Sequence, residues 1–130
     1  MNRERTVLVV DDEPDVVEIL SYNLNKAGYT VRTCTDSTQA LSIARELKPH
    51  LVLLDIRMPD LNGIDVCRSI KADSGLFSTP VVFLTADSDD YTTFNALSAG
   101  GDHFITKPIH PRLVISIVDE LVNRDESLID

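Results

Sequence analysis

Short apolar runs alternate with longer segments of helical spacing along the whole chain. Each run is rich in Val, Leu, Ile or Thr and predicts a strand, at 6–10, 30–34, 51–54, 80–85 and 102–106. Each longer segment has apolar residues three or four positions apart and predicts a helix, at 15–28, 36–49, 63–72, 89–100 and 111–124. The pattern therefore predicts five consecutive β-α units.

Proline and glycine residues support these helix boundaries. Pro14 and Pro111 fit the first turns of the first and last helices, because the first turn tolerates a residue without an N–H. Gly28 and Gly100 fit the ends of the first and fourth helices, where a left-handed residue commonly closes the last turn.

Alternating strands and helices predict an α/β fold in which helices cover both faces of a parallel sheet. For (βα)5 the common doubly wound arrangement is the flavodoxin-like, three-layer α/β/α fold with strand order 2-1-3-4-5. In such a fold the chain reverses its winding between strands 1 and 3. Ligands bind there, outside the carboxyl ends of the strands.

Length and composition limit the possible functions. The 130 residues suit one domain, which we expect to span 1–124, with 125–130 as a polar tail or the start of a linker. The formal net charge of −9 argues against direct nucleic-acid binding. Cys34 and Cys67 lie far apart and indicate free thiols in a reducing compartment. No run has the length of a signal-peptide core or membrane span, so we expect a cytoplasmic protein without membrane contact.

Polar residues follow the strands at the edge where a ligand is expected. Asp11 and Asp12 follow the first strand, Asp55 follows the third, and Thr85 and Lys107 end the fourth and fifth. Each residue alone has an ordinary explanation, such as a helix cap, a turn or a solvated loop residue. Their placement at one edge of one sheet favours a shared site.

The charges of this edge predict what it binds. Two carboxylates about 4 Å apart repel each other by roughly 4 kcal/mol at an effective dielectric constant of about 20. Hard carboxylate oxygens suit Mg²⁺, and Mg²⁺ held by one or two carboxylates usually also binds a phosphate. Thr85 and Lys107 would then contact phosphoryl oxygens, and Asp55 could become an aspartyl phosphate. We expect Met58-Pro59 to bend the loop after Asp55 and Gly63 to permit the turn into the next helix.

Four motifs give the sequence a family resemblance over about residues 5–124. They are "VLVVDDEPD", "LVLLDIRMPDLNG", "VVFLTA" and "GGDHFITKPI", in that order. Together they resemble the response-regulator receiver domain of two-component signal transduction, so the resemblance covers nearly the whole chain.

The resemblance implies a role for each site residue. Asp55 would accept the phosphoryl group. Asp12, Asp55 and the backbone carbonyl of Arg57 would bind Mg²⁺, or alternatively Mn²⁺, while Asp11 would hold the metal through water. Lys107 would contact the phosphoryl group.

The resemblance also implies a switch. Thr85 would move to bind the phosphate, Phe104 would follow as the switch aromatic, and the bond before Pro108 would be cis. The face formed by the fourth helix, the fifth strand and the fifth helix would carry the signal to a downstream protein or effector domain. The donor would be a sensor histidine kinase or a histidine phosphotransfer protein. The domain would be a phosphoacceptor switch that assists its own phosphorylation and dephosphorylation rather than an enzyme.

Three residues are individual to this chain. Arg57 and Asp87 lie two positions after Asp55 and Thr85, and we hypothesise that they pair at the pocket rim and slow hydrolysis of the phosphoryl group. The alternative is two solvated charges worth less than about 1 kcal/mol. Gly101 stands where the family more often has Ala, and we expect it to loosen the start of the fifth strand.

Two other protein classes fit less well. A phosphatase of the haloacid dehalogenase type would need a second Asp where Arg57 stands, and a cap insertion. A flavin-binding carrier would need a glycine- and hydroxyl-rich loop after the first strand, where the chain has "DDEPD".

The three histidines, His50, His103 and His110, have no metal-ligand spacing. Whether the chain acts as a stand-alone receiver or as the receiver of a longer regulator is left open.

Overall fold

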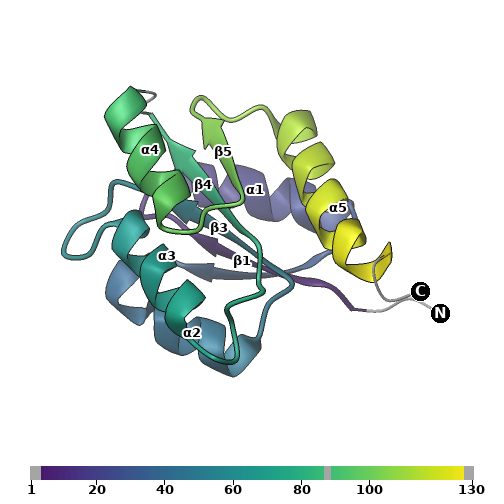
Figure 1. Ribbon diagram of the computed structural model, residues 1–130. Coiled ribbons are helices and arrows are strands. Elements are labelled where there is room, and N and C mark those ends of the chain that lie inside the picture. Colours follow the sequence, from purple (N-terminus) through teal and green to yellow (C-terminus); the bar gives the residue numbers. More distant parts are fainter. Residues whose placement is uncertain (1–3, 87–88, 128–130) are drawn as a thin grey trace.

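The structure is a computed structural model that describes residues 4–86 and 89–127. Strands and helices alternate through these residues, as the sequence predicts (Figure 1). The strands are β1 (Thr6–Val10), β2 (Thr30–Cys34), β3 (Leu51–Asp55), β4 (Val81–Thr85) and β5 (His103–Thr106). The helices are α1 (Pro14–Lys26), α2 (Ala40–Leu47), α3 (Gly63–Ala72), α4 (Asp90–Ser98) and α5 (Pro111–Ser127), with a 3₁₀ turn at Ser37–Gln39.

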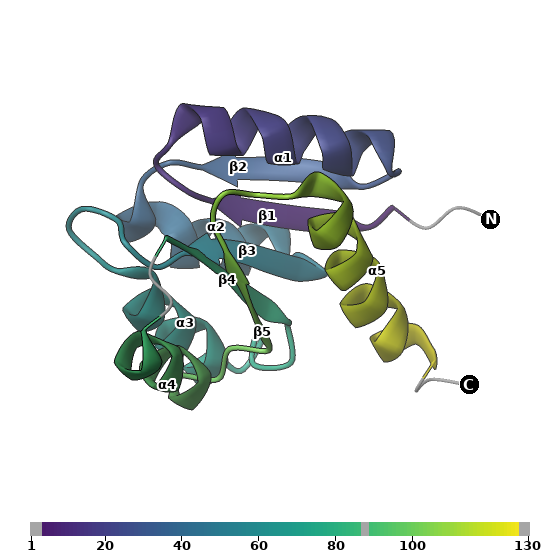
Figure 2. The same cartoon turned by 90° about the horizontal axis from the view of Figure 1, so that it is seen from above.

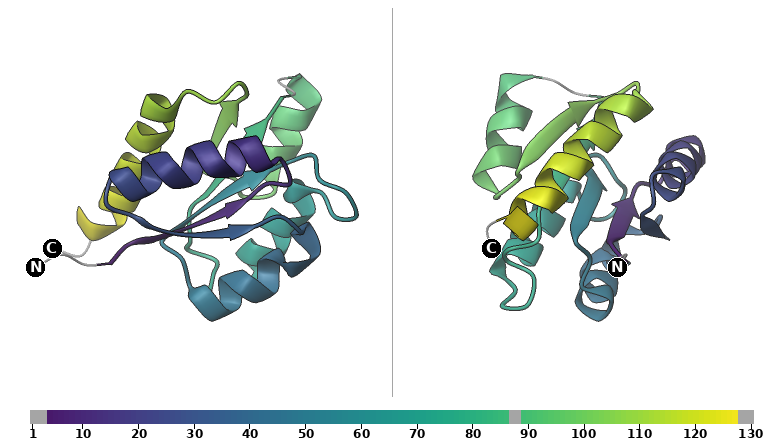
Figure 3. Two further views of the ribbon diagram at one scale, coloured as in Figure 1. Left: turned by 180° about the vertical axis from the view of Figure 1, so that it is seen from behind. Right: turned by 90° about the vertical axis from the view of Figure 1, so that its right-hand side faces the viewer.

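The five strands form one parallel sheet in the order β2-β1-β3-β4-β5, so the predicted topology is confirmed. Helices α1 and α5 cover one face, and α2, α3 and α4 cover the other (Figure 2). Seen from behind, α1 lies across its face of the sheet with α5 beside it (Figure 3). Strands β1 and β3 are neighbours at the centre, where the winding reverses.

Two apolar clusters hold the three layers together. Because successive side chains of a strand point to opposite faces, Val7 and Val9 pack towards α1 and α5, while Leu8 and Val10 pack towards α2, α3 and α4. All four side chains are fully buried, and so are Leu51–Leu54 of β3. Burial on both faces explains why these strands have continuous apolar runs rather than an apolar-polar alternation.

Most predicted boundaries lie within two residues of the observed ones, and two helices differ in an informative way. The helix predicted over 36–49 begins as a 3₁₀ turn capped by Asp36 and ends at Leu47, where Lys48 takes a left-handed conformation with a φ of 49°. The helix predicted over 111–124 continues to Ser127. The added residues contain no Pro or Gly, so their polarity alone was a poor signal for the end of the helix. Among the described helices, none is both long and apolar enough to cross a membrane.

Gly101 precedes β5 and has a packing role that differs from the expected one. A Cβ at this position would lie 2.4 Å from Cε2 and 2.7 Å from Cδ2 of Phe83, a fully buried residue of β4. The ring of Phe83 therefore occupies the space that an alanine methyl group would need. Glycine here accommodates a large neighbour, which is a packing requirement; the loosening of β5 stays a prediction.

Candidate functional site

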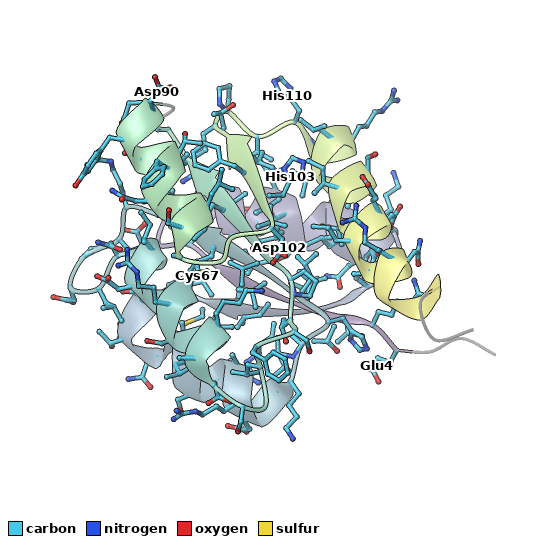
Figure 4. All side chains as sticks on the ribbon, in the orientation of Figure 1. Glu4, Cys67, Asp90, Asp102, His103 and His110 are labelled. Carbon is cyan, nitrogen blue, oxygen red and sulfur yellow. The ribbon has the colours of Figure 1, made fainter. Side chains whose placement is uncertain are left out.

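The predicted site residues lie at the carboxyl ends of the central strands. In Figure 4 this end of the molecule is marked by Asp90 and His110, and Glu4 marks the opposite end. Asp11 and Asp12 follow β1, and Asp55 is the last residue of β3. Because β1 and β3 are adjacent and parallel, these carboxylates meet: one oxygen from each lies within 4.8 Å of the others. The predicted gathering of three aspartates is confirmed.

Asp11 is the most deeply buried member of the cluster. Its side chain is fully buried, and burial raises the pKa of the carboxyl. Its Oδ1 accepts a hydrogen bond of 2.9 Å from the backbone N–H of Glu13. Its Oδ2 is buried and accepts no hydrogen bond from the described residues, although the Lys107 ammonium lies 3.1 Å away. This oxygen therefore has capacity for another positive partner.

Asp55 is also buried, with 3 % of its surface exposed. Burial and the neighbouring Asp11 raise the pKa of the Asp55 carboxyl to about 6, against the opposing effects of Lys107 and of a hydrogen bond from the Arg57 N–H. Without a further positive charge, the ionised form of Asp55 is therefore disfavoured at this position. The cost arises because the buried apolar strand Leu51–Leu54 places Asp55 at the edge of the core.

Lys107 is the cation of the site. Its Nζ lies 2.5 Å from Glu13 Oε1, 3.1 Å from Asp11 Oδ2 and 3.6 Å from Asp55 Oδ2. Burial alone would lower the pKa of Lys107, but the nearby carboxylates of Glu13 and Asp11 outweigh burial and raise it. Glu13 was not among the predicted site residues. Its only sequence signal is its place as the third consecutive acid after β1.

Three more predicted residues lie in or next to β4 and β5: Thr85 ends β4, Phe104 lies within β5, and Pro108 follows β5. The side chain of Thr85 is buried at the end of β4, next to the end of β3. Its carbonyl oxygen accepts a 2.7 Å hydrogen bond from the Lys107 N–H, which ties the two strand ends together. Phe104 is partly buried against the cluster beneath α2, α3 and α4. The Lys107–Pro108 peptide bond is cis, as the resemblance implies.

Gly63, the first residue of α3, packs directly against the backbone of Asp55. A Cβ at Gly63 would lie 2.2 Å from the carbonyl oxygen of Asp55. The Gly63 N–H donates a 2.8 Å hydrogen bond to the carbonyl of Ile56. The sequence predicted a glycine needed for a turn, whereas its φ is unremarkable and the close backbone approach is what excludes a side chain.

The loop after Asp55 contains the remaining predicted residues. Met58 is buried in the core, which holds the loop against the molecule, and Arg57 is exposed. Asp87, the proposed partner of Arg57, lies outside the described residues. The ordinary explanation of Asp12 as a helix cap does not hold, because Glu13 occupies the N-cap position of α1.

The acidic cluster fits a divalent cation. Its donor atoms are three hard carboxylate oxygens, the type that Mg²⁺ and Mn²⁺ prefer. The buried Asp11 Oδ2 that accepts no hydrogen bond supports this fit. A cation here would also offset the repulsion among the carboxylates. Lys107 alone leaves an excess of negative charge, because it faces Asp11, Glu13 and Asp55 together.

Comparisons with known proteins agree with this geometry. Residues 7–119 match the family model described as the response regulator receiver domain. The chain is 42% identical over 120 residues to the DNA-binding response regulator MtrA of Mycolicibacterium smegmatis, a match that covers 92% of this chain and 51% of MtrA. It is 39% identical over 126 residues to the alkaline phosphatase synthesis transcriptional regulatory protein PhoP of Bacillus subtilis, covering 97% of this chain and 51% of PhoP.

A solved structure shows the same fold. The BeF3-activated N-terminal receiver domain of Klebsiella pneumoniae RstA superimposes with a TM-score of 0.83 at 26% sequence identity, covering 91% of this chain and 98% of that one. The chain spans about half the length of the curated relatives it matches.

Proposed function

The chain belongs to the response regulator receiver family, whose general function is phosphorelay signalling, and we propose that its Asp55 accepts the phosphoryl group. The main observation that supports this proposal is the geometry at the carboxyl ends of β1 and β3. Three carboxylates lie within 4.8 Å of one another, and the Lys107 ammonium lies 3.6 Å from Asp55. Asp55 is the last residue of the central strand β3, whereas Asp11 and Asp12 follow β1.

The cluster would hold Mg²⁺, with Mn²⁺ as the alternative. Asp12, Asp55 and the backbone carbonyl of Arg57 are the proposed direct ligands, and Asp11 would act through water. When bound, the metal supplies positive charge that neutralises the carboxylates and the transferring phosphoryl group. The donor set and the buried Asp11 Oδ2 without a hydrogen bond support this assignment.

The transfer uses the carboxylate of Asp55 as nucleophile. An oxygen of Asp55 forms a bond to phosphorus as the P–N bond of a phosphohistidine breaks, and the imidazole nitrogen leaves with the electron pair. Lys107 stabilises the charge that spreads over the phosphoryl oxygens. The donor is a sensor histidine kinase or a histidine phosphotransfer protein. In this role the domain is a phosphoacceptor switch that assists its own phosphorylation and dephosphorylation.

Phosphorylation would then shift the conformation of a nearby face. Thr85 gains a hydrogen-bond acceptor when the phosphoryl group is attached, and Phe104, on the neighbouring strand, turns inward as Thr85 moves. The strand register supports this coupling, because Thr85 pairs with Thr106 and Phe83 with Phe104. The changed surface is formed by α4, β5 and α5, and it would signal to a downstream protein or effector domain.

The curated relatives are a DNA-binding response regulator and a transcriptional regulatory protein, and this chain matches about half of each. We therefore propose that the receiver domain spans residues 1–124 and that an effector domain supplies the output. The receiver domain itself would contact neither nucleic acid nor membrane, and it would act in the cytoplasm.

Intact-protein mass spectrometry tests the acceptor. The chain is incubated with Mg²⁺ and acetyl phosphate beside two variants, Asp55→Asn and Asp60→Asn. Asp60 is exposed on the same loop and has a φ of 71°, a conformation that Asn tolerates, so this variant is a matched control. We expect the mass of one phosphoryl group on the wild type and on the Asp60→Asn variant, and none on the Asp55→Asn variant.

Phosphorylation of the Asp55→Asn variant would assign the acceptor to another residue. If the wild type gains no mass from acetyl phosphate, the same assay with a phosphorylated histidine phosphotransfer protein as donor decides the proposal. Failure with both donors would refute it.

A further inference from the structure

Lys107 is paired most closely with a residue outside the carboxylate cluster. Its Nζ lies 2.5 Å from Glu13 Oε1 but 3.6 Å from Asp55 Oδ2. The contact to Glu13 is a hydrogen-bonded ion pair, and the approach to Asp55 is an ion pair without a hydrogen bond. The ammonium is therefore drawn towards Glu13, away from the oxygen that would carry the phosphoryl group.

The two partners differ in how easily they can separate. The side chain of Lys107 is 12% exposed, whereas that of Glu13 is 58% exposed. Both residues line a groove of about 290 Å³ beside the site. Glu13 can therefore exchange Lys107 for water at small cost, whereas Asp11, which is fully buried, cannot.

An ammonium group has three N–H donors, and three carboxylates already surround Lys107. A phosphoryl group on Asp55 brings new acceptor oxygens, which compete with these carboxylates for the ammonium. The exposed Glu13 is the partner whose release costs least.

We propose that Glu13 is a positioning residue that holds Lys107 away from Asp55 and so limits the rate of phosphoryl uptake. The inference rests on the proposed function, because it concerns access of Lys107 to a phosphoryl group on Asp55. Glu13 acts through Lys107 and does not touch the reacting atoms.

Glu13→Gln is a suitable probe of this role. It keeps the shape of the side chain and removes the charge that holds the ammonium. Glu13 makes no side-chain capping hydrogen bond to α1, so the substitution leaves the start of the helix unchanged. Asp15→Asn is the matched control, because Asp15 lines the same groove and its substitution changes the net charge equally.

The experiment measures phosphoryl uptake from acetyl phosphate with Mg²⁺ by intact mass. It compares the wild type, Glu13→Gln and Asp15→Asn, each alone and combined with Lys107→Met. We expect Glu13→Gln to accelerate uptake about fivefold, the factor that a partly exposed ion pair of ~1 kcal/mol corresponds to. We expect Asp15→Asn to remain close to wild type and the acceleration to disappear when Lys107 is replaced.

Two further readouts separate positioning from a general electrostatic effect. The affinity for beryllium fluoride with Mg²⁺, measured by NMR titration, reports access of Lys107 to a phosphoryl mimic without covalent transfer. We expect tighter binding by Glu13→Gln than by Asp15→Asn. The ¹⁵N resonance of the Lys107 ammonium in metal-free protein should shift in Glu13→Gln and not in Asp15→Asn.

Unchanged or slower uptake by Glu13→Gln, with normal uptake by the wild type, would overturn this inference and leave the proposed function intact. Equal acceleration by Asp15→Asn would also overturn it, because the effect would then be one of net charge. A wild type that neither takes up phosphate nor binds beryllium fluoride would refute the proposed function and this inference together.

Discussion

Replacing Asp55 by Asn should stabilise the metal-free domain, although it removes the proposed acceptor. Burial and Asp11 raise the pKa of the Asp55 carboxyl to about 6 in the folded protein. In the unfolded chain an aspartate has a pKa of about 3.9. Between these values the folded state binds a proton that the unfolded state does not, so the free energy of unfolding decreases as the pH rises through this window.

The size of the effect follows from the two pKa values. At about 1.4 kcal/mol per pH unit, the ionised Asp55 costs roughly 3 kcal/mol of folding free energy above pH 7. An asparagine has no proton to lose, and its carbonyl oxygen can still accept the hydrogen bond from the Arg57 N–H. We therefore expect Asp55→Asn to be more stable than the wild type by about 2 to 3 kcal/mol at pH 8. The difference should fall towards zero near pH 4.

Urea unfolding followed by far-UV circular dichroism, with EDTA present, measures this difference across pH. The exposed Asp60→Asn variant controls for the loss of one charge and should stay within about 0.5 kcal/mol of the wild type. Saturating Mg²⁺ should stabilise the wild type by mass action and narrow its gap to Asp55→Asn. A destabilised Asp55→Asn variant at pH 8, or a gain that does not depend on pH, would refute the electrostatic reasoning.

Three other substitutions test particular contacts. Gly63→Ala should cost about 3 kcal/mol and abolish phosphoryl uptake, because its Cβ would meet the carbonyl oxygen of Asp55, the proposed acceptor. Uptake at wild-type rate would contradict this. Gly101→Ala should lower the free energy of unfolding by about 2 kcal/mol, measured by urea unfolding, and Phe83→Leu in the same chain should recover part of that loss. Strictly additive losses of stability would refute the contact. Arg57→Ala should speed loss of the phosphoryl group, measured by mass after removal of the donor, if Arg57 and Asp87 shield it; an unchanged rate would dismiss the hypothesis.

The topology and most of the site follow from local sequence patterns. Continuous apolar runs such as Leu51–Leu54 indicate strands buried on both faces, and the intervening helical spacing implies parallel strands. Because the carboxyl ends of parallel strands share one edge, the proximity of Asp11 and Asp55 could be predicted from the order of the strands alone. This part of the prediction depends on order along the chain, which the sequence contains.

Contacts between distant side chains could not be predicted in the same way. The pairing of Glu13 with Lys107 depends on the path of two loops that no periodicity describes. The need for glycine at position 101 depends on the ring of Phe83, on a different strand. Gly63 had a local explanation as a turn residue, and only the fold shows that its Cα packs on the Asp55 backbone. In each case a short contact joins residues that are remote in sequence or separated by an irregular loop.

The energetic cost at the carboxyl edge is linked to the proposed binding of a cation. A neutral group at position 55 would remove the repulsion with Asp11, but it would also remove a proposed cation ligand and the proposed nucleophile for phosphorus. The domain therefore retains a folded state that is strained at the site and stable elsewhere, with two fully packed clusters on either side of the sheet. A cation that offsets the repulsion among the carboxylates binds the folded state more tightly than the unfolded state, so cation binding and stability are linked. Lys107, held between Glu13 and Asp55, is the only cation within 4 Å of these carboxylates among the described residues. If the proposal holds, its pairing with Glu13 limits the rate of phosphoryl uptake.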